Sequence, residues 1–347
     1  MRRPFVTFLI ATLIIASAAV PGSAQEAVFT GNEILFTGWR DRAAVYSVDP
    51  ASGEQRRLTS RRAAVPVWSP ARDRIAFIRY WSTSDWIPDV KSSLMVLDRD
   101  GTIHQLTDGK TNDFDAAWSP DGSRLVFSRY TTEDNIISVH LFVINADGSG
   151  LTELTSGKGI TDAEASWSPD GSKIAFTHNS TFQSILIIDV ESGETTALGG
   201  DPDILDSQPR WSPDGRYIAF NRYFFSNDQS DIYVADLEAK RFIALTKSDK
   251  IEEGPVWSPD GTEIAFVKVL WRDFNPEIFV KSLGGGAATR LTNQKKGDHY
   301  PVWSGDGSQI AFVRGDGRDQ DVYLVSRDGG RGRRLTRTPI QESTLDW

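Results

Sequence analysis

Short apolar runs of four residues recur along the chain, separated by polar and glycine-rich segments that are typical of turns. Runs of this length are typical of buried strands. An Ile/Leu-x-Phe segment precedes every run and a Leu-Thr pair follows six of the seven, so the same order returns seven times. The runs occupy residues 45–48, 94–97, 141–144, 185–188, 232–235, 278–281 and 322–325. This pattern predicts an all-β protein.

A tryptophan precedes most Ile/Leu-x-Phe segments, and the turn between them is repeated. The clearest copies read Trp-Ser-Pro-Asp-Gly, in which Pro presets the turn backbone and Gly takes its left-handed position. Such a turn closes a tight antiparallel hairpin. The tryptophans follow one another at intervals of 44–50 residues: Trp68, Trp118, Trp167, Trp211, Trp257, Trp303 and Trp347. A repeat of this length with four short strands predicts a β-propeller of four-stranded antiparallel blades.

The phase of the repeat predicts how the propeller closes. The first repeat opens on a second strand at residues 34–36, and Trp347 is in step with the tryptophans of the first strands. We therefore expect seven blades with a composite closing blade, whose first strand is residues 345–347 and whose other strands lie in 34–59. Closure of this kind removes the exposed edges of an open sheet. The alternative is six blades with unpaired ends.

The first 24 residues differ from the repeat. Arg2 and Arg3 precede an apolar run over residues 5–20, and Gly22, Ser23 and Ala24 offer small residues for cleavage. This pattern predicts a signal peptide over residues 1–24 and a β-propeller domain over 25–347. The alternative is an uncleaved anchor, although the run is short of the ~20 residues that a membrane span needs. The chain has no cysteine, which excludes disulfides and lipid attachment through an N-terminal cysteine.

The charge of the chain excludes one class of partner. The formal net charge is −9, and cleavage after residue 24 would remove two further arginines. Nucleic-acid binding requires a basic surface, so we expect no nucleic-acid partner. After cleavage we also expect no transmembrane span, and we expect a monomer in the periplasm or the secreted fraction.

The Trp-Ser-Pro-Asp-Gly-x-x-Ile-Ala-Phe block, with Leu-Thr upstream, resembles the WD40-like repeat of the TolB-type propeller family over roughly residues 28–347. The resemblance implies an exported, non-enzymatic protein that binds a protein partner in the cell envelope. The chain differs from TolB itself, which carries an α/β domain before a six-bladed propeller. Related repeats also form the propeller of prolyl oligopeptidase-like enzymes and of oligogalacturonate lyases, which act on sugars through a metal and histidines.

An acidic residue stands five positions before six of the seven tryptophans, and Ala63 interrupts the series. We expect these acids to ring one mouth of the central channel: Asp113, Asp162, Asp206, Glu252, Asp298 and Glu342. A ring of one sign would seat a cation, Ca²⁺ in the first place, or a basic peptide segment. The alternative is that each acid accepts backbone N–H bonds and fixes its own loop. We expect no other cofactor.

The connections between second and third strands are long and aromatic. We expect them to bind a partner on the same face as the acids, through Trp81, Trp86, Tyr130, Tyr223, Phe224 and Trp271. The alternative is that these rings fold back over the blades as small additional cores. A second surface is predicted where Arg56, Arg57, Arg61 and Arg62 meet the arginines at 331, 333, 334 and 337, if the ring closes.

The sequence offers little for catalysis. It contains no Gly-x-Ser-x-Gly motif, and its four histidines, at 104, 140, 178 and 299, fall in different repeats without a metal-ligand spacing. We therefore predict a non-enzymatic scaffold for an envelope or secreted protein. The alternative is a carbohydrate-binding or metal-dependent polysaccharide-acting propeller.

Overall fold

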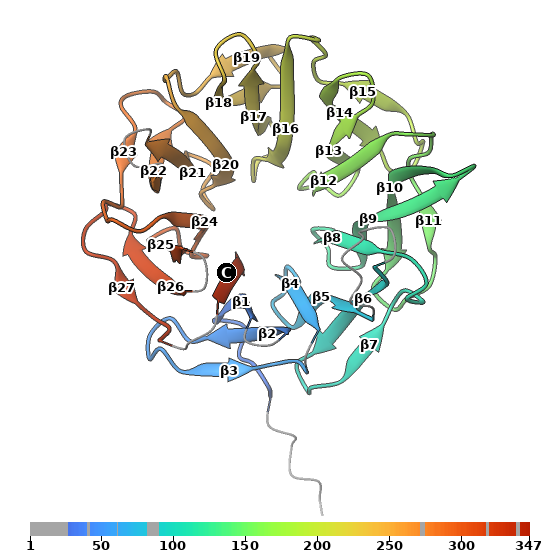
Figure 1. The fold of residues 1–347 in the computed structure, drawn as a ribbon, viewed down its shortest axis with the longest axis horizontal. Coiled ribbons are helices and arrows are strands. Elements are labelled where there is room, and N and C mark those ends of the chain that lie inside the picture. Colours follow the sequence, from blue (N-terminus) through green and yellow to red (C-terminus); the bar gives the residue numbers. More distant parts are fainter. Residues whose placement is uncertain are drawn as a thin grey trace, which may run out of the picture.

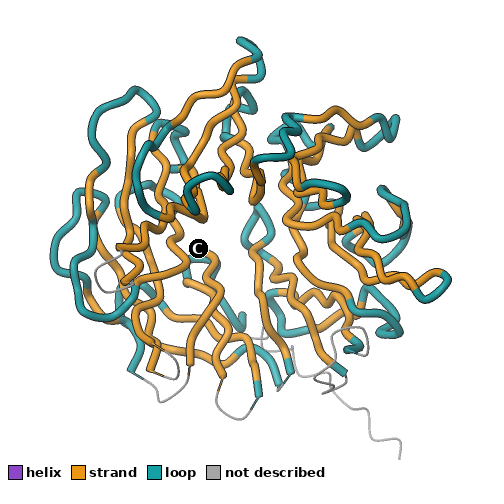
Figure 2. Tube along the Cα trace, turned by 45° about the horizontal axis from the view of Figure 1, so that its top comes forward, coloured by secondary structure: helices purple, strands orange, loops and turns teal. Residues whose placement is uncertain are grey.

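The computed structural model describes residues 27–39, 42–60, 62–81, 90–270, 275–316, 319–337 and 341–347. These residues form strands joined by turns and loops, and none of them is helical, as the apolar pattern predicts (Figure 2). The described part of the chain accordingly has no helix of the length and apolarity that a membrane crossing requires. The expected signal peptide, residues 1–24, lies outside it and stays a prediction.

Strands of four kinds follow one another along the chain. The first strands end at or beside a repeat tryptophan: β4 (Ala63–Trp68), β8 (Asp113–Trp118), β12 (Thr161–Trp167), β16 (Ile204–Trp211), β20 (Ile251–Trp257), β24 (Asp298–Trp303) and β28 (Gln341–Asp346). The second strands carry the Ile/Leu-x-Phe segments: β1 (Ile34–Trp39), β5 (Arg74–Tyr80), β9 (Arg124–Glu133), β13 (Lys173–Asn179), β17 (Tyr217–Phe224), β21 (Glu263–Leu270) and β25 (Gln309–Asp316).

The remaining strands are the apolar runs and the short strands that follow them. The third strands are β2 (Ala43–Val48), β6 (Ser92–Asp98), β10 (Ile136–Asn145), β14 (Gln183–Asp189), β18 (Gln229–Asp236), β22 (Asn275–Ser282) and β26 (Asp319–Ser326). The fourth strands are β3 (Gln55–Arg57), β7 (Ile103–Gln105), β11 (Thr152–Glu153), β15 (Thr195–Ala197), β19 (Arg241–Ala244), β23 (Thr289–Arg290) and β27 (Arg333–Arg334).

Successive strands pair antiparallel in the order first, second, third, fourth. Three sheets have four strands each, and two have eight. Each eight-stranded sheet consists of two four-stranded units joined by one parallel contact, Val139 with Thr161 or Ser230 with Ile251. Figure 1 shows the units arranged in a ring, with the first strands nearest the centre and the fourth strands at the periphery.

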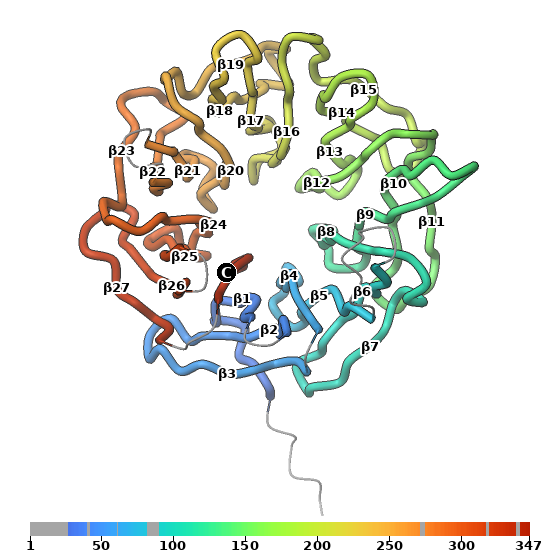
Figure 3. The backbone as a smooth tube through the Cα atoms, viewed as in Figure 1, coloured from blue at the N-terminus to red at the C-terminus, as the bar shows by residue number. Residues whose placement is uncertain are grey.

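The two ends of the described chain meet in one sheet. Strand β28 pairs antiparallel with β1, so that Leu35 faces Asp346 and Gly38 faces Glu342. The resulting sheet has the order β28-β1-β2-β3. In Figure 3 the last segment of the trace accordingly lies beside β1.

The core lies between neighbouring sheets, where the phenylalanines of the second strands are buried. Phe77 and Phe127, for example, are fully buried. The cluster around Phe127 joins residues of its own sheet to Ala76 and Ile78 of the preceding sheet. The small alanine lets the two sheets approach, because side chains alternate between the faces of a strand. Burial between neighbouring four-stranded units therefore stabilises the ring.

The repeated tryptophans also connect neighbouring sheets. The indole Nε1 of Trp118 donates to the carbonyl of Val67 in the preceding sheet at 3.2 Å, and Trp303 donates to Val256 at 3.1 Å. Trp211 departs from the series, since its buried Nε1 has no partner among the described residues. The Trp position is thus both an apolar core residue and a hydrogen-bond donor between sheets.

The Leu-Thr pairs compensate for the shortness of the fourth strands. The hydroxyl of Thr107 accepts a hydrogen bond from the backbone N–H of Leu94 at 2.9 Å, and Thr336 accepts one from Val322 at 2.8 Å. These N–H groups of the third strands are buried, and an unpaired buried donor is costly. The Thr side chain therefore continues the pairing just beyond the end of the fourth strand.

The turns between first and second strands have the backbone that the sequence predicts. Gly122 has a φ of 67° in a Ser-Pro-Asp-Gly turn, and Arg72 at the corresponding place has a φ of 55°. A non-glycine residue in this region costs about 1 kcal/mol. Arg72 has compensating contacts, because its Nη1 donates to the Gly31 carbonyl at 2.9 Å and its guanidinium lies 5.5 Å from the Trp68 ring.

Candidate functional site

The six acids that precede the tryptophans stand at or near the start of the inner strands, and their side chains are buried. Their residues are at most 2% exposed: Asp113, Asp162, Asp206, Glu252, Asp298 and Glu342. A buried carboxylate needs a partner, because burial without one disfavours its charged form. The bonds of each acid are therefore what decides its role.

Five of the acids contact a basic residue of the next strand in the same sheet, four of them as ion pairs with an arginine or lysine and one through a histidine. Arg129 binds both oxygens of Asp113, through Nε at 2.6 Å and Nη2 at 2.9 Å. The other pairs are Arg222 with Asp206, Arg314 with Asp298, Lys268 with Glu252 at 2.6 Å, and His178 with Asp162 at 2.6 Å. In each case the base is the acid's cross-strand neighbour. These acids occupy the expected periodic positions, and the charges of Asp113, Asp206, Glu252 and Asp298 are balanced by a cation of the same sheet.

The basic series has its own sequence signal, which the repeat alone did not draw attention to. A base stands two residues after the buried phenylalanine in six second strands: Arg79, Arg129, His178, Arg222, Lys268 and Arg314. Because the first and second strands run antiparallel around a fixed turn, this position always faces the acid position. Phe-x-base together with acid-x₄-Trp would have predicted the ion pairs.

Two neighbouring sheets break the pairing in complementary ways. Gly38 faces Glu342, whose carboxylate instead accepts from the Val322 N–H at 2.8 Å and from the Thr336 hydroxyl at 2.5 Å. In the next sheet, the fully buried Ala63 faces Arg79. In one sheet glycine stands at the base position, and in the next alanine stands at the acid position.

Burial perturbs several titratable groups of the inner strands. It raises the pKa of Asp206, although the adjacent Arg222 guanidinium acts in the opposite direction. Burial also raises the pKa of Asp115, with the charge of Arg210 opposing it, and lowers the pKa of His299. Desolvation disfavours the charged form of each group.

A second feature of the inner strands is a bulge three residues before every repeat tryptophan. The residues there have positive φ values between 46° and 67°: Val65, Asp115, Glu164, Gln208, Gly254, Tyr300 and Thr344. The register shifts beside each of them. A bulge re-aims the local side chains and increases the twist of the strand. Nothing in the residue types predicts it, since they range from Gly to Val and Tyr.

The bulges also connect neighbouring four-stranded units around the axis of the ring. The Asp115 carboxylate accepts from the N–H of Glu164 at 2.6 Å, and the Glu164 carboxylate accepts from the N–H of Gln208 at 2.9 Å. Elsewhere the Thr37 hydroxyl accepts from the N–H of Val65 at 2.9 Å. The polar groups of the inner strands therefore serve contacts between sheets as well as within them.

The arrangement of possible metal ligands follows from this pairing. The described residues contain no group of three His, Asp or Glu side chains that could hold a metal ion. His140 contacts Glu153 at 2.8 Å, and His104 contacts Asp98 at 2.8 Å in another sheet. The structure carries no test of Ca²⁺ at the acid positions, so that site stays a prediction.

The expected partner-binding aromatics differ in exposure. Trp81 is exposed, whereas Tyr130 is half-buried against Phe114 with ring centroids 5.2 Å apart. Tyr223 and Phe224 are half-buried too, and the Tyr223 hydroxyl donates to Asp228 at 2.5 Å. Trp86 and Trp271 lie outside the described residues. Trp81 is thus the most exposed of the four described members of the set.

Exposed hydrophobic residues gather at the end of the ring where second strands connect to third strands. Nine large hydrophobic residues are exposed in the described part of the chain, and six of them lie at these connections. The six are Trp39, Trp81, Ile136, Ile137, Phe182 and Phe225. Trp39 was not predicted from the sequence, because it is the last residue of a strand that is otherwise buried. Exposed hydrophobic residues that gather at one end are typical of interaction surfaces.

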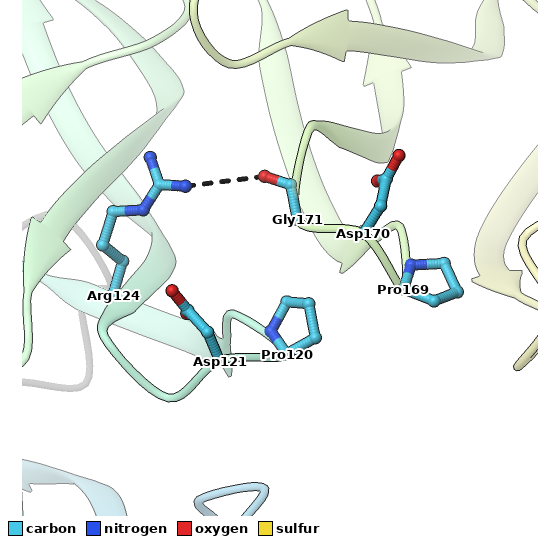
Figure 4. Close-up of a pocket in the computed structure, with 6 residues that line it drawn as sticks. All are labelled: Pro120, Asp121, Arg124, Pro169, Asp170 and Gly171. Atoms are coloured by element: carbon cyan, nitrogen blue, oxygen red, sulfur yellow. Dashed lines mark hydrogen bonds between the residues drawn. The ribbon is translucent and has the colours of Figure 1, made fainter.

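The opposite end of the ring carries the repeated turns, which contact one another. Figure 4 shows Arg124 extending from one turn toward Gly171 of the next, and its Nη2 donates to the Gly171 carbonyl at 3.5 Å. The same guanidinium lies 5.1 Å from the ring of Trp167. A small open cavity of about 280 Å³ lies between these turns, beside Pro120 and Pro169. Contacts of this kind stabilise the junction between sheets.

Comparison with known families decides the relationship. The family model described as "TolB beta propeller domain" matches residues 60–203 and 184–347, which together cover most of the chain. The chain belongs to the TolB β-propeller family. The resemblance inferred from the Trp-Ser-Pro-Asp-Gly block is thereby confirmed. No curated protein sequence matches this TolB propeller.

Solved structures share the fold at low sequence identity. TolB from Acinetobacter baumannii is 16% identical, with a TM-score of 0.57, over 95% of this chain and 88% of that one. An oligogalacturonate lyase in complex with manganese is 14% identical, with a TM-score of 0.63, over 88% and 84%. A Mycobacterium tuberculosis puromycin-hydrolysing peptidase is 17% identical, with a TM-score of 0.65, over 91% of this chain but 55% of that one. The fold is therefore shared by TolB and by enzymes of two kinds.

Proposed function

We propose that this TolB propeller is an exported, non-enzymatic scaffold that binds a protein partner in the periplasm or cell envelope. The observation that carries the proposal is the gathering of six exposed hydrophobic residues at the second-to-third-strand end. Trp39, Trp81 and Phe225 are each more than two-fifths exposed. Aromatic residues are enriched in the energetically important parts of protein interfaces.

The proposed scaffold has seven blades. Each four-stranded unit corresponds to one copy of the repeat, and the two eight-stranded sheets each hold two such units. The pairing of β28 with β1 supports a composite seventh blade rather than six blades with unpaired ends.

The non-enzymatic assignment is supported by how the inner-strand charges are used. Asp113, Asp206 and Asp298 each give both carboxylate oxygens to an arginine of the same sheet. Bidentate pairs of this kind fix both partners and leave neither free to accept or donate a proton. Export is supported by the signal-like residues 1–24 and by the family resemblance.

Affinity capture from an envelope extract tests the proposal. The bait is the wild-type protein, a variant with Trp39→Ser and Phe225→Ser, or a control variant with Leu151→Ser and Phe242→Ser. The control removes exposed hydrophobic residues that lie away from the second-to-third-strand end. We expect a partner that the wild type and the control capture and the first variant loses.

Two outcomes would contradict the proposal. If all three baits captured the same proteins, the partner would bind another surface or no specific partner would exist. Specific binding of an acidic oligosaccharide on a glycan array, with no protein captured, would favour the carbohydrate-binding alternative.

A further inference from the structure

Arg79 is the one base of the repeated series that has no carboxylate opposite it. In five other four-stranded units the corresponding base is paired with a buried acid of the adjacent strand. Opposite Arg79 stands Ala63, whose methyl group cannot accept a hydrogen bond. The fold therefore places a guanidinium in a position that was built around an ion pair, without the acid that completes it.

The atoms of Arg79 show what is missing. Arg129, Arg222 and Arg314 each use Nε and Nη2 to bind the two oxygens of one carboxylate, at 2.6–2.9 Å. The Nε of Arg79 is buried and has no hydrogen-bond partner among the described residues. A buried donor without a partner costs about 1–3 kcal/mol, and more when the group is charged. The Nε–H that binds a carboxylate in the equivalent arginines is thus the donor left unsatisfied here.

The surroundings of Arg79 are aromatic and basic. Its guanidinium carbon lies 5.8 Å from the ring of Trp81 and 5.7 Å from that of Phe77. Arg62 adds a second cation, with its Nη1 donating to the Trp81 carbonyl at 2.8 Å. A planar cation beside an exposed indole is suited to a carboxylate attached to an apolar group.

Hydrogen bonds place the second exposed tryptophan at the same end. The backbone N–H of Arg62 donates to the Ala43 carbonyl at 2.6 Å, and Ala43 is the cross-strand neighbour of Trp39. The N–H of Tyr80 in turn donates to the Arg62 carbonyl at 2.8 Å. Strands β1 and β2 accordingly lie beside β4 and β5 in Figure 1. Trp39 therefore belongs to the same end of the ring as Arg79 and Trp81.

We propose that Arg79 anchors a carboxylate of a partner polypeptide, supplied by an Asp or Glu side chain beside an apolar residue that packs on Trp81. The partner's carboxylate takes the role that Asp113, Asp206 and Asp298 have in the other sheets. The net charge of −9 disfavours polyanionic ligands and favours a ligand with a single local charge. This inference rests on the proposed protein-binding function and specifies its chemistry.

The test uses two short synthetic peptides and the intact protein. The probes are acetyl-Gly-Trp-Asp-Gly-amide and the same peptide with Asn in place of Asp. Binding is followed by NMR through the Nε–H signal of Arg79, which is assigned by its absence from Arg79→Gln, and by calorimetry. We expect the Asp peptide to shift this signal saturably, and the Asn peptide to bind at least tenfold more weakly.

Three variants sharpen the test. Arg79→Gln removes the anchor, and Ala63→Asp supplies an internal carboxylate that occupies it, so each is expected to weaken Asp-peptide binding at least tenfold. Arg241→Gln removes an exposed arginine of β19, in another sheet, and is expected to leave binding unchanged. If Ala63→Asp fails to fold, Arg79→Gln and the Asn peptide still decide.

Several results would overturn the inference. They are equal binding of the Asp and Asn peptides, unchanged binding by Arg79→Gln, and galacturonate binding tenfold tighter than the Asp peptide. A partner lost with the Trp39→Ser and Phe225→Ser variant but kept by Arg79→Gln would overturn this inference alone. Peptide binding at Arg79 without any captured partner would support the site and count against the proposed function.

Discussion

At the scale of single residues, the ion pair of Asp298 and Arg314 provides a direct measure of what the repeated acids do. Asp298 is fully buried, and Arg314 binds its two oxygens at 2.6 and 2.8 Å. Removing one partner leaves an uncompensated buried charge, which typically costs 3–5 kcal/mol. We therefore expect Arg314→Gln to lower the free energy of unfolding by about that amount, as measured by urea denaturation at pH 7.

Arg79→Gln is the matched control, since it removes a base from the same strand position where Ala63 replaces the acid. No carboxylate is left uncompensated there, so the expected loss is below ~1 kcal/mol. Equal losses for the two variants would mean that the acids contribute nothing through their pairing.

The repeated tryptophans allow a second comparison between equivalent residues. Trp303 donates to the Val256 carbonyl of the preceding sheet at 3.1 Å, whereas the Trp211 Nε1 has no partner among the described residues. Replacement by Phe removes the indole N–H donor at both positions and reduces the size of the aromatic ring by the same amount. We expect Trp303→Phe to cost about 1–2 kcal/mol more than Trp211→Phe, because only Trp303→Phe leaves a carbonyl unpaired. Thermal and urea unfolding measure the difference, and equal costs would show that the indole acts through packing alone.

At the scale of the strand and turn, the Ser-Pro-Asp-Gly hairpins make stability depend on pH. The serine hydroxyl and backbone N–H groups hold the pKa of Asp121, Asp170 and Asp260 at about 2. A carboxyl whose pKa is lower in the folded state stabilises the protein above its unfolded pKa of 3.8. This contribution is lost as pH falls through about 2.

We therefore expect the melting temperature to fall steeply between about pH 4 and pH 2. Asp260→Asn removes one contribution, because the amide binds the Ser258 hydroxyl and the turn N–H groups without a charge. The variant should be less stable than the wild type at pH 7 and nearly equal to it at pH 2. A constant difference across this range would exclude the ionised carboxylate as the cause. Calorimetric scans at half-unit pH steps measure it.

The turns and strands were the part of the fold most accessible from the sequence, because their signals are local. A four-residue turn motif specifies its own backbone, and Arg72, which stands where the other turns have glycine, has the same left-handed conformation with a φ of 55°. The periodic acids were also found, but their environment was not. Whether Asp298 faces solvent or Arg314 depends on the register of two strands, and this becomes visible only when the Phe-x-base series is aligned with the acids.

Other features of the candidate site have no sequence signal. Val65 and Tyr300 each lie in the bulge of their own strand and have a positive φ that neither residue type favours. The strand twist and the neighbouring sheets therefore impose this conformation. Trp39 is exposed although it ends a buried strand, because the chain leaves the sheet there. The unpaired state of Arg79 emerges only from comparing equivalent positions across sheets in three dimensions.

At the scale of the whole molecule, stability depends on every sheet having two neighbours. The core clusters lie between four-stranded units, and the bulge and tryptophan bonds run from one unit to the next. Such an arrangement approaches the behaviour of repeat proteins, whose stability is a sum of unit and interface terms. A single open junction would therefore expose two faces at once, and the junction most exposed to this risk is the one formed by the two ends of the chain.

Deletion of residues 341–347 tests the closure directly. It removes β28, which pairs with β1, and with it the Thr344 hydroxyl that contacts Thr37 at 2.7 Å. It also removes the Glu342 carboxylate that accepts from the Val322 N–H of the adjacent sheet at 2.8 Å. Because several kcal/mol of pairing and burial are lost together, we expect the melting temperature to fall by roughly 10 °C or more. A synthetic peptide of residues 341–347, added in excess, should restore part of the loss by binding the open edge. An unchanged melting curve would show that the ring does not depend on β28, and a fall that the peptide cannot reverse would point to misfolding of the truncated chain instead.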